Sequence, residues 1–488
     1  MSVRSKAWAW GRPWLSWGAV LLQALLVVVG GVGLAHALAH DGWERVVAVI
    51  TQGFVVVTAL AHPLLGLIVG LVLVPFAPFW HFDIALGAGI PDLSLTRVVV
   101  LTVWFITLVR WATGELDFPP VGRTEVGILL FLGGMLLATF HALKGFLFAL
   151  QTAFDAYVIP MSLYILMRTW VNNRFRLRLA LYGLMFIAFY MSVVIMLEAW
   201  AGLSAFYPWG RPALYSESLR RITSFFGNPV YHALILAVIF PLVVYEYEVG
   251  ETPWHRGGAL GLLLVILTAY SILYTRAGYL ALAIAALLLG IVYPRWRRLI
   301  LPAAGVALFV LVLFWQRLTH SALFLERLTY APSLESRGKT IEVAWRLWKE
   351  SPIFGIGYPN YGVIALQRGY LHRIDDKWTP TPHNTFLGIL SQGGLIAFLG
   401  YTVMIAAIAR EAWTYFRTWM GEEGNPRVWG EHPGYLAWAA FVAFIAYMLI
   451  IATIDADPAY YSNMVFYAFL GTAFGYLARV TPPRERRG

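Results

Sequence analysis

The chain has 488 residues, of which 59% are hydrophobic and only 13% are charged. Soluble domains carry about 25% charged residues, so this composition indicates a membrane protein. The sequence contains no cysteine, which excludes thiol catalysis, cysteine-ligated zinc and disulfide bonds. A formal charge of +10 is compatible with nucleic-acid binding, but most basic residues lie in short gaps between apolar runs. That distribution is typical of membrane topology, and we expect no nucleic acid among the partners.

Apolar runs recur along the whole sequence. A membrane-spanning helix needs about 20 mostly apolar residues, and about fourteen runs approach that length. They cover residues 14–38, 45–61, 63–80, 94–111, 124–142, 153–170, 177–201, 229–248, 257–275, 277–293, 298–316, 384–409, 433–454 and 460–479. The first is too long for the apolar core of a signal peptide, so we expect it to remain as a span. The sequence predicts an all-α polytopic membrane protein with about 12–14 transmembrane helices.

The basic residues predict an orientation. When the N-terminus is placed in the cytoplasm, most inner connections carry arginines, whereas the outer connections 81–94 and 455–459 carry no lysine or arginine. Both termini are then cytoplasmic. About eleven spans precede a long outer segment at 317–383, and about three follow it in 384–488. Because long segments cross the membrane regardless of charge, the basic residues of 317–383 need another explanation, and a polyanionic substrate is the simplest.

Three side chains are candidates for chemistry at the outer surface. Arg276 lies in a very short turn between two apolar runs, where an ionisable group is either functional or a snorkelling interface residue. Arg337 begins a predicted amphipathic helix, and a guanidinium group can bind phosphate through two parallel hydrogen bonds. His383 stands at the start of the twelfth run. Positive surroundings should lower its pKa and keep the imidazole neutral, as a general base requires.

Other residues are predicted to assist. The amphipathic helix at 336–350 places Ile341, Ala344, Trp345 and Trp348 on one face, which we expect to lie on the outer membrane surface or to stack on sugars. Ser351-Pro352 should end this helix, and Gly355 and Gly357 should form a tight turn. Asp455 and Asp457 either orient His383, bind sugar hydroxyls or solvate a helix end. The candidate substrate-binding residues are Arg221, Lys339, Trp345, Trp348, Asn384 and Asp455.

Three pieces of the sequence resemble the O-antigen ligase and O-antigen polymerase family of bacterial envelope glycosyltransferases. The resemblance covers roughly 215–400 and rests on Thr275-Arg276-Ala277-Gly278, on Ser336-Arg337-Gly338 followed by Ser351-Pro352-Ile353-Phe354-Gly355-Ile356-Gly357, and on His383-Asn384 followed after nine residues by Gly394-Leu395-Ile396. It implies a GT-C type enzyme of the bacterial inner membrane, with its active site on the periplasmic side. It also implies two essential arginines and a histidine, which correspond to Arg276, Arg337 and His383, and activity without a metal or cofactor.

The implied partners are an undecaprenyl-diphosphate-linked glycan as donor, a glycan acceptor and the surrounding membrane lipids. A lipid diphosphate is a good leaving group whose developing charge two arginines can stabilise. The acceptor hydroxyl needs a base, and His383 is the strong candidate in the segment. We therefore expect direct displacement at the anomeric carbon with inversion, in which Arg276 and Arg337 hold the diphosphate and His383 accepts the proton.

Competing interpretations remain open at this point. A transporter or flippase for a lipid-linked glycan predicts broken helices near the bilayer midplane and repeat symmetry, and neither is evident in the sequence. A metal-dependent oligosaccharyl transferase would need acidic ligands in an early outer loop, where only Asp83 and Asp92 occur. A purely structural membrane protein would not explain the outer basic cluster. The sequence does not separate a ligase, which uses lipid A–core oligosaccharide as acceptor, from a polymerase, which uses another lipid-linked glycan.

Overall fold

The computed structural model describes residues 43–481 except for 78–79, 81, 85–91, 203–221, 223, 321–330, 372–380, 422–426 and 429–430. The first half of the chain forms α2 (Trp43–Ala61), α3 (Pro63–Leu73), η1 (Val74–Phe76), α4 (Leu95–Ala112), α5 (Arg123–Thr139), α6 (Phe146–Ala153), the π-helical η2 (Phe154–Val158), α7 (Ile159–Trp170), α8 (Arg174–Ala201) and η3 (Ser224–Phe226). The second half forms α9 (Pro229–Val249), α10 (Pro253–Leu273), α11 (Arg276–Val292), α12 (Pro294–Leu313), α13 (Trp315–Thr319), α15 (Ala331–Glu350), α16 (Tyr361–Gln367), α17 (Thr385–Trp419), α18 (Pro433–Ile451) and α19 (Tyr460–Val480). The predicted run at 14–38 lies outside the described residues, and each later run coincides with one or two of these helices.

Eight helical segments in the described part of the chain are long and apolar enough to cross a membrane. They are α4, the continuous segment Phe146–Trp170, α8, α9, α10, α12, α17 and α18. Shorter apolar helices cover Arg45–Ala61, Pro63–Phe76 and Arg276–Val292. The all-α polytopic membrane architecture expected from the sequence is therefore confirmed.

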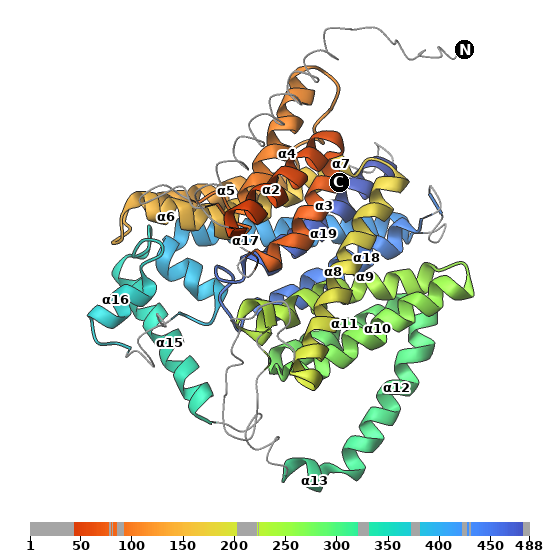
Figure 1. The fold of residues 1–488 in the computed structure, drawn as a ribbon. Coiled ribbons are helices and arrows are strands. Elements are labelled where there is room, and N and C mark those ends of the chain that lie inside the picture. The colour runs from red at the N-terminus through yellow and green to blue at the C-terminus, as the bar shows by residue number, and fades with distance from the viewer. Residues whose placement is uncertain are drawn as a thin grey trace.

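The centre of the bundle is formed by α9, α18 and α19, with the other long helices packed around them (Figure 1). In α9, 89% of the apolar window is buried inside the protein, and in α18 the share is 72%. By contrast, only 6% of the apolar window of α12 is buried, and α12 extends away from the bundle in Figure 1. An apolar helix with so little protein around it is suited to contact with the hydrocarbon of the bilayer.

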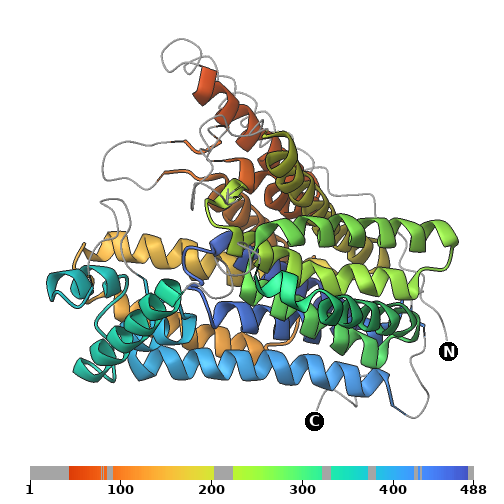
Figure 2. The ribbon, with the colours of Figure 1, turned by 90° about the horizontal axis from the view of Figure 1, so that it is seen from below.

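The longest helix, α17, reaches from one end of the bundle to the other (Figure 2, light blue). Small residues let α5 pack closely along it. A Cβ atom added to Gly127 would lie 2.5 Å from the Cα of Met404, and one added to Gly134 would lie 2.6 Å from the Cα of Ala397. Small residues are a common means by which membrane helices approach one another, so α5 and α17 form one rigid pair.

Several helices begin at the same end of the bundle. Thr385 at the start of α17 donates a hydrogen bond to the carbonyl of Ile454 (2.8 Å), just after α18. Ser462 in the first turn of α19 donates to the carbonyl of Tyr231 in the first turn of α9 (3.1 Å). The helices α15 and α16 lie at this end, on the left in Figure 1, and we call it the α15 end. The opposite end is where α5 begins and where α7, α17 and α19 finish.

Candidate active site

The helix α15 packs on α16 through one narrow apolar face. Val343, Ala344 and Leu347 are buried against Tyr361 and Ala365 of α16. The face of α15 that was predicted to be apolar is therefore only partly buried. Ala344 of that face is buried, but the side chains of Ile341 and Trp345 are exposed. Trp345 instead lies beside Trp348, with ring centroids 4.6 Å apart and the ring planes tilted by 45°. Their contact with a membrane or a sugar stays a prediction.

A joint between two chain segments fixes α15 relative to α17. The helix α15 ends at Glu350, as predicted, and the chain then runs as Pro352–Gly357 across a break in α17 at Gln392–Gly394. The amide of Ile356 donates to the carbonyl of Ser391 (2.9 Å), and the amide of Leu395 donates to that of Pro352 (2.9 Å). These backbone hydrogen bonds replace the helical ones that the break removes.

Glycine is needed on both sides of this joint. Gly355 and Gly394 have φ angles of 73° and 66°, in the left-handed region that side chains disfavour. A Cβ on Gly355 would lie 2.3 Å from the carbonyl oxygen of Gln392, and one on Gly394 would lie 2.2 Å from that of Ile353. The glycines that carry the family resemblance thus hold two backbones in contact, and they act on the site by positioning it.

A second set of contacts places Arg337 above the start of α17. Thr340 of α15 donates to the carbonyl of Pro382 (3.2 Å), and Tyr361 donates to the carbonyl of Thr340 (2.7 Å). Arg337 lies one turn before Thr340, and its side chain is exposed. Its positive charge acts on His383, the residue after Pro382. The structure therefore brings Arg337 and His383 together from segments that are far apart in the sequence.

His383 is held by its backbone and by a neighbouring carboxylate. Its φ of 51° lies in the left-handed region, which is rare for a residue with a side chain and recurs at functional sites. Its amide donates to Oδ2 of Asp455 (2.9 Å), and its Nδ1 lies 3.9 Å from the same oxygen. The His383 side chain is 47% exposed, whereas that of Asp455 is 6% exposed. The imidazole thus faces open space on one side and a buried carboxylate on the other.

The ionisation of this group fits a neutral base. Burial, and secondarily the positive charge of Arg337, lower the pKa of His383 below its ordinary value. Burial also raises the pKa of Asp455 to about 6, against hydrogen bonds from Thr381 and from the amides of His383 and Asn384. At pH 7 the histidine is therefore mostly neutral and Asp455 mostly ionised. A carboxylate beside Nδ1 favours the tautomer with its proton on Nδ1, which leaves Nε2 able to accept a proton.

The other predicted residues are placed as follows. Arg276 begins α11 and is half-buried, and its side chain forms no hydrogen bond or ion pair with another described residue. Its turn lies against the start of α9, because Tyr270 donates to the carbonyl of Ala233 (3.0 Å). Arg276 is therefore at the α15 end, as are Arg337 and His383. Lys339 is exposed on α15, and Arg221 lies outside the described residues.

Asn384 caps α17. Its side-chain oxygen accepts a hydrogen bond from the amide of Leu387 (3.0 Å), and its side-chain nitrogen donates to the carbonyl of Ala452 (2.9 Å). These bonds explain why asparagine follows the histidine: the cap holds the start of α17 against the end of α18. The role of Asn384 in substrate binding stays a prediction beside this structural one.

Two tyrosines at the site were not predicted from the sequence. Tyr157 of η2 donates to Oδ1 of Asp457 (2.9 Å), and the ring of Tyr358, which follows the glycine turn, packs against that of Tyr157 with centroids 5.7 Å apart. Burial, and then the charge of Asp455, raise the pKa of Asp457 to about 6. For Tyr358, its position directly after Gly357 was the one feature of the sequence that could have indicated a place at the site. Tyr157 comes from a span more than 200 residues away from Asp457, so only the fold reveals it.

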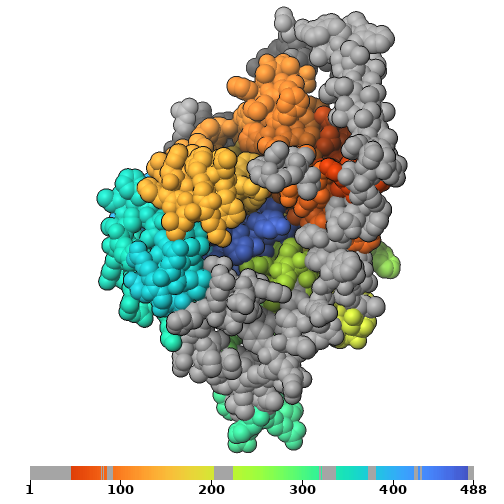
Figure 3. All heavy atoms as spheres, turned by 60° about the vertical axis from the view of Figure 1, so that its left-hand side comes forward, coloured from red at the N-terminus to blue at the C-terminus, as the bar shows by residue number. Residues whose placement is uncertain are grey.

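Figure 3 shows the face at this end, where blue residues near the start of α19 are visible beside the cyan α15–α16 region. Close by, Asp83 and Asp92 line a cavity of about 260 Å³ together with Arg97 and Asp155. Arg97 pairs with Asp155, donating from Nε to Oδ1 (2.8 Å). Arg97 also donates to the backbone carbonyl of Asp92 (2.6 Å), and Asp83 accepts from the amide of Leu95 (2.8 Å).

Comparison with known protein families matches residues 260–402 to the O-antigen ligase family. No curated protein matches the chain. The matched segment runs from α10 into α17, and it contains Arg276, Arg337, His383 and the joint between Pro352–Gly357 and Gln392–Gly394. It therefore covers the residues that the fold gathers at the α15 end. Residues 260–402 of this polytopic membrane protein are therefore similar to the O-antigen ligase family.

Proposed function

We propose that the protein is a metal-independent, inverting glycosyltransferase that moves a glycan from undecaprenyl diphosphate to a sugar hydroxyl. The observation that carries the proposal is the arrangement around His383, whose Nδ1 lies 3.9 Å from the buried Asp455 carboxylate and whose pKa is lowered by burial and by the charge of Arg337. The α15 end then faces the periplasm, both termini are cytoplasmic, and 317–383 supplies one wall of the active site. This orientation agrees with the arginine-rich connections at the opposite end.

In this reaction the acceptor oxygen attacks the anomeric carbon of the donor glycan, and the bond between that carbon and the diphosphate oxygen breaks. The bonding electrons leave with the diphosphate, and Arg276 and Arg337 stabilise the charge that develops there. The acceptor proton passes to Nε2 of His383. Asp455 stabilises the resulting imidazolium, because its carboxylate lies 3.9 Å from Nδ1. One face of the sugar is attacked while the other loses the diphosphate, so the configuration inverts.

One feature of the structure would favour a transporter, and its surroundings argue against that reading. The helix α17 is broken at Gly394, as helices at transporter binding sites are. In a transporter the freed backbone groups line a cavity and bind the substrate or ion. Here Pro352–Gly357 fills the break, and its amides and carbonyls take up the freed groups. The break therefore positions the proposed active site and leaves no ion site of its own at this point.

The proposal is tested with purified protein in nanodiscs, supplied with an undecaprenyl-diphosphate-linked glycan and candidate acceptors. Transfer to an acceptor that continues in the presence of EDTA is the expected result. Activity that is abolished by EDTA and restored by Mg²⁺ or Mn²⁺ would move the protein to the metal-dependent class. Transport of the donor without transfer would support the flippase alternative.

The acceptor is identified by the intermediate that accumulates when the gene is deleted. A ligase acts after chain extension, so its loss should leave long, unattached glycans on the lipid carrier. A polymerase performs the extension, so its loss should leave single repeats attached to the acceptor. Analysis of the lipid-linked glycans in the deletion strain separates these two outcomes.

A further inference from the structure

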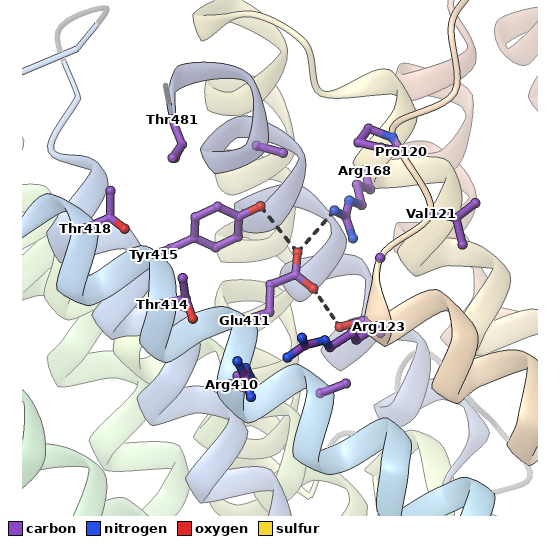
Figure 4. A pocket seen from close by; sticks show the side chains of 14 residues that line it. Pro120, Val121, Arg123, Arg168, Arg410, Glu411, Thr414, Tyr415, Thr418 and Thr481 are labelled. Atoms are coloured by element: carbon purple, nitrogen blue, oxygen red, sulfur yellow. Dashed lines mark hydrogen bonds and ion pairs between the residues drawn. The ribbon is translucent and has the colours of Figure 1, made fainter. Parts of the chain in front are cut away.

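A second polar cavity lies at the opposite end of the bundle from His383. It has a volume of about 380 Å³ and is formed where α5 begins and α7, α17 and α19 finish (Figure 4). Three arginines line it: Arg123, Arg168 and Arg410. Among the described residues that line it, Glu411 is the one acidic residue, so this lining carries a positive formal charge.

The acidic residues near the cavity are already engaged. Glu411 forms an ion pair with Nη2 of Arg168 (3.1 Å) and accepts a hydrogen bond from Thr124 (2.6 Å). Glu125, behind the cavity, pairs with the other terminal nitrogen of Arg168. Both carboxylates are therefore paired with the buried Arg168. Arg123 and Arg410 are exposed at the mouth and add two further positive charges to the lining.

The buried arginine also has an unused donor. The Arg168 side chain is only 5% exposed, and its Nε is buried without a hydrogen-bond partner among the described residues. A buried donor without a partner costs free energy, which an acceptor entering the cavity would recover. Thr414 and Thr418 also line the same space, whereas the hydroxyl of Tyr415 already donates to Glu411 (3.3 Å). Arginines together with hydroxyl donors are the groups that bind phosphate oxygens.

An apolar groove continues from this cavity along α5 and α17. Arg123 and Arg410 line both spaces, and the groove adds Val126, Val403 and Ala406. Val126 and Val403 are 45% and 44% exposed. A charged pocket that opens into an apolar groove on the membrane-facing side of two helices matches an amphiphile with an anionic head and a hydrocarbon tail. In the orientation proposed above, this pocket lies at the cytoplasmic surface of the membrane.

We propose that this cavity binds the phosphate of an anionic phospholipid, with Arg123 and Arg410 on the headgroup and one acyl chain along the groove of α5 and α17. Basic pockets between membrane helices at the cytoplasmic surface are suited to such headgroups. Soluble phosphorylated compounds carry the same phosphate group, but they have no hydrocarbon chain that could occupy the apolar groove. The site is separate from the glycosyl-transfer chemistry, and only its placement at the cytoplasmic surface rests on the proposed orientation.

The test uses the purified, delipidated full chain in detergent. Phosphatidylglycerol, phosphatidylcholine with the same acyl chains, and inorganic phosphate are titrated, and binding is measured by native mass spectrometry and by the shift in Tm. We expect phosphatidylglycerol to bind at least about tenfold more tightly than phosphatidylcholine, the effect of one charge-assisted hydrogen bond. The double variant Arg123→Gln, Arg410→Gln should lose this preference, and the corresponding double lysine variant should retain most of it.

Arg479→Gln provides the matched control, because Arg479 is an exposed arginine at the same end that does not line the cavity. This variant should bind phosphatidylglycerol like the unmodified chain. Since Arg123 and Arg410 are exposed, the lipid-free double glutamine variant should keep its Tm. Equal binding of the two lipids, or equal loss in Arg479→Gln, would overturn the proposal. Inorganic phosphate that binds as tightly as phosphatidylglycerol, and only when both arginines are present, would overturn the lipid assignment and identify a soluble anion.

Discussion

Two arginine sites at opposite ends of the helical bundle differ in how the positive charge is balanced. At the end opposite α15, Arg178 pairs with Glu246 (2.6 Å) and Glu431 (2.5 Å), and both carboxylates are completely buried. At the α15 end, Arg337 is exposed and Arg276 half-buried, and the buried carboxylate lies beside a histidine. Arginines with matched buried carboxylates hold helices together. An exposed arginine that acts on a neutral histidine is what the proposed reaction with a charged donor requires.

This contrast explains why charge alone does not identify the active site. Arg168 is a more deeply buried arginine than Arg276, and by burial it would rank as the stronger candidate. Its pairing with Glu125 and Glu411 shows that its charge serves the fold. The useful signal is the combination of an accessible cation, a residue in a strained backbone conformation and a buried acid, and His383 with its neighbours provides it.

The largest effect should come from His383→Ala. Removing a general base lowers the transfer rate about 10²–10⁴-fold. The residual rate should rise with pH, because hydroxide can replace the missing base. Turnover in nanodiscs across a pH series measures both effects. His320→Ala is the matched control, since His320 is exposed in the segment preceding α15, and its rate should stay normal. Equal losses in the two variants would show that the effect is not specific to the base.

Replacing Arg178 by alanine should have an effect of comparable free energy, but on the stability of the fold. Removing one partner of a buried ion pair leaves the carboxylates uncompensated, which costs about 3–5 kcal/mol. The effect should be a lower Tm in detergent, with turnover per folded molecule almost unchanged. Arg479→Ala, at the same end but exposed, should leave Tm nearly constant. If Arg178→Ala kept full stability and lost turnover, the assignment of this end to structure would be wrong.

A smaller effect is expected from changes at Arg337. Arg337→Lys keeps the charge but loses the planar pair of donors, and the rate should fall about 10- to 150-fold. Arg337→Gln also removes a charge that lowers the pKa of His383, so that pKa should rise. Since only the neutral histidine acts as a base, activity in this variant should be lost at a higher pH on acidification. The pH–rate profiles of the two variants test this, and identical acid limbs would contradict it.

The smallest effect should come from Asp455→Asn. The amide still accepts the hydrogen bond from the His383 backbone but no longer stabilises the imidazolium, and we expect a rate loss of about tenfold, equal to one unit of pKa. Asp455, with its pKa of about 6, becomes protonated as the pH falls, and His383 becomes charged. Both changes lower activity in acid. Part of this loss of activity at acidic pH should disappear in Asp455→Asn. An unchanged pH–rate profile would argue against the role of Asp455.

Much of the architecture could be predicted because its signals are local. Apolar runs mark the helices from residue 45 onward, and Ser351-Pro352 marks the end of α15. The proximity of Arg337 and His383 was also expected, through the family resemblance. The sequence could not show which face of α15 is buried, because α16 decides it: Val343 and Leu347 pack on that short helix, and Trp345 is left outside.

Long-range pairings account for what the sequence did not reveal. The break in α17 at Gly394 is stable only because Pro352–Gly357 supplies the missing hydrogen bonds. The contact between Tyr157 and Asp457 joins spans that are 300 residues apart. The cavity at Arg410 needs three other helices to form. In each case the partner lies far away in the sequence, so no local pattern carries the information.

His383 is proposed as the base, and Arg276 and Arg337 are proposed to hold the diphosphate. These separate roles are tested most directly by measuring donor binding and turnover in the same nanodisc samples. His383→Ala should bind the undecaprenyl-diphosphate-linked glycan almost normally and lose turnover, because the base acts on the acceptor. Arg276→Lys and Arg337→Lys should weaken the contact with the diphosphate and lower turnover by about 10- to 150-fold, with Arg276→Ala worse than Arg276→Lys. If His383→Ala lost donor binding while the arginine variants kept both binding and rate, the roles assigned to these residues would be contradicted.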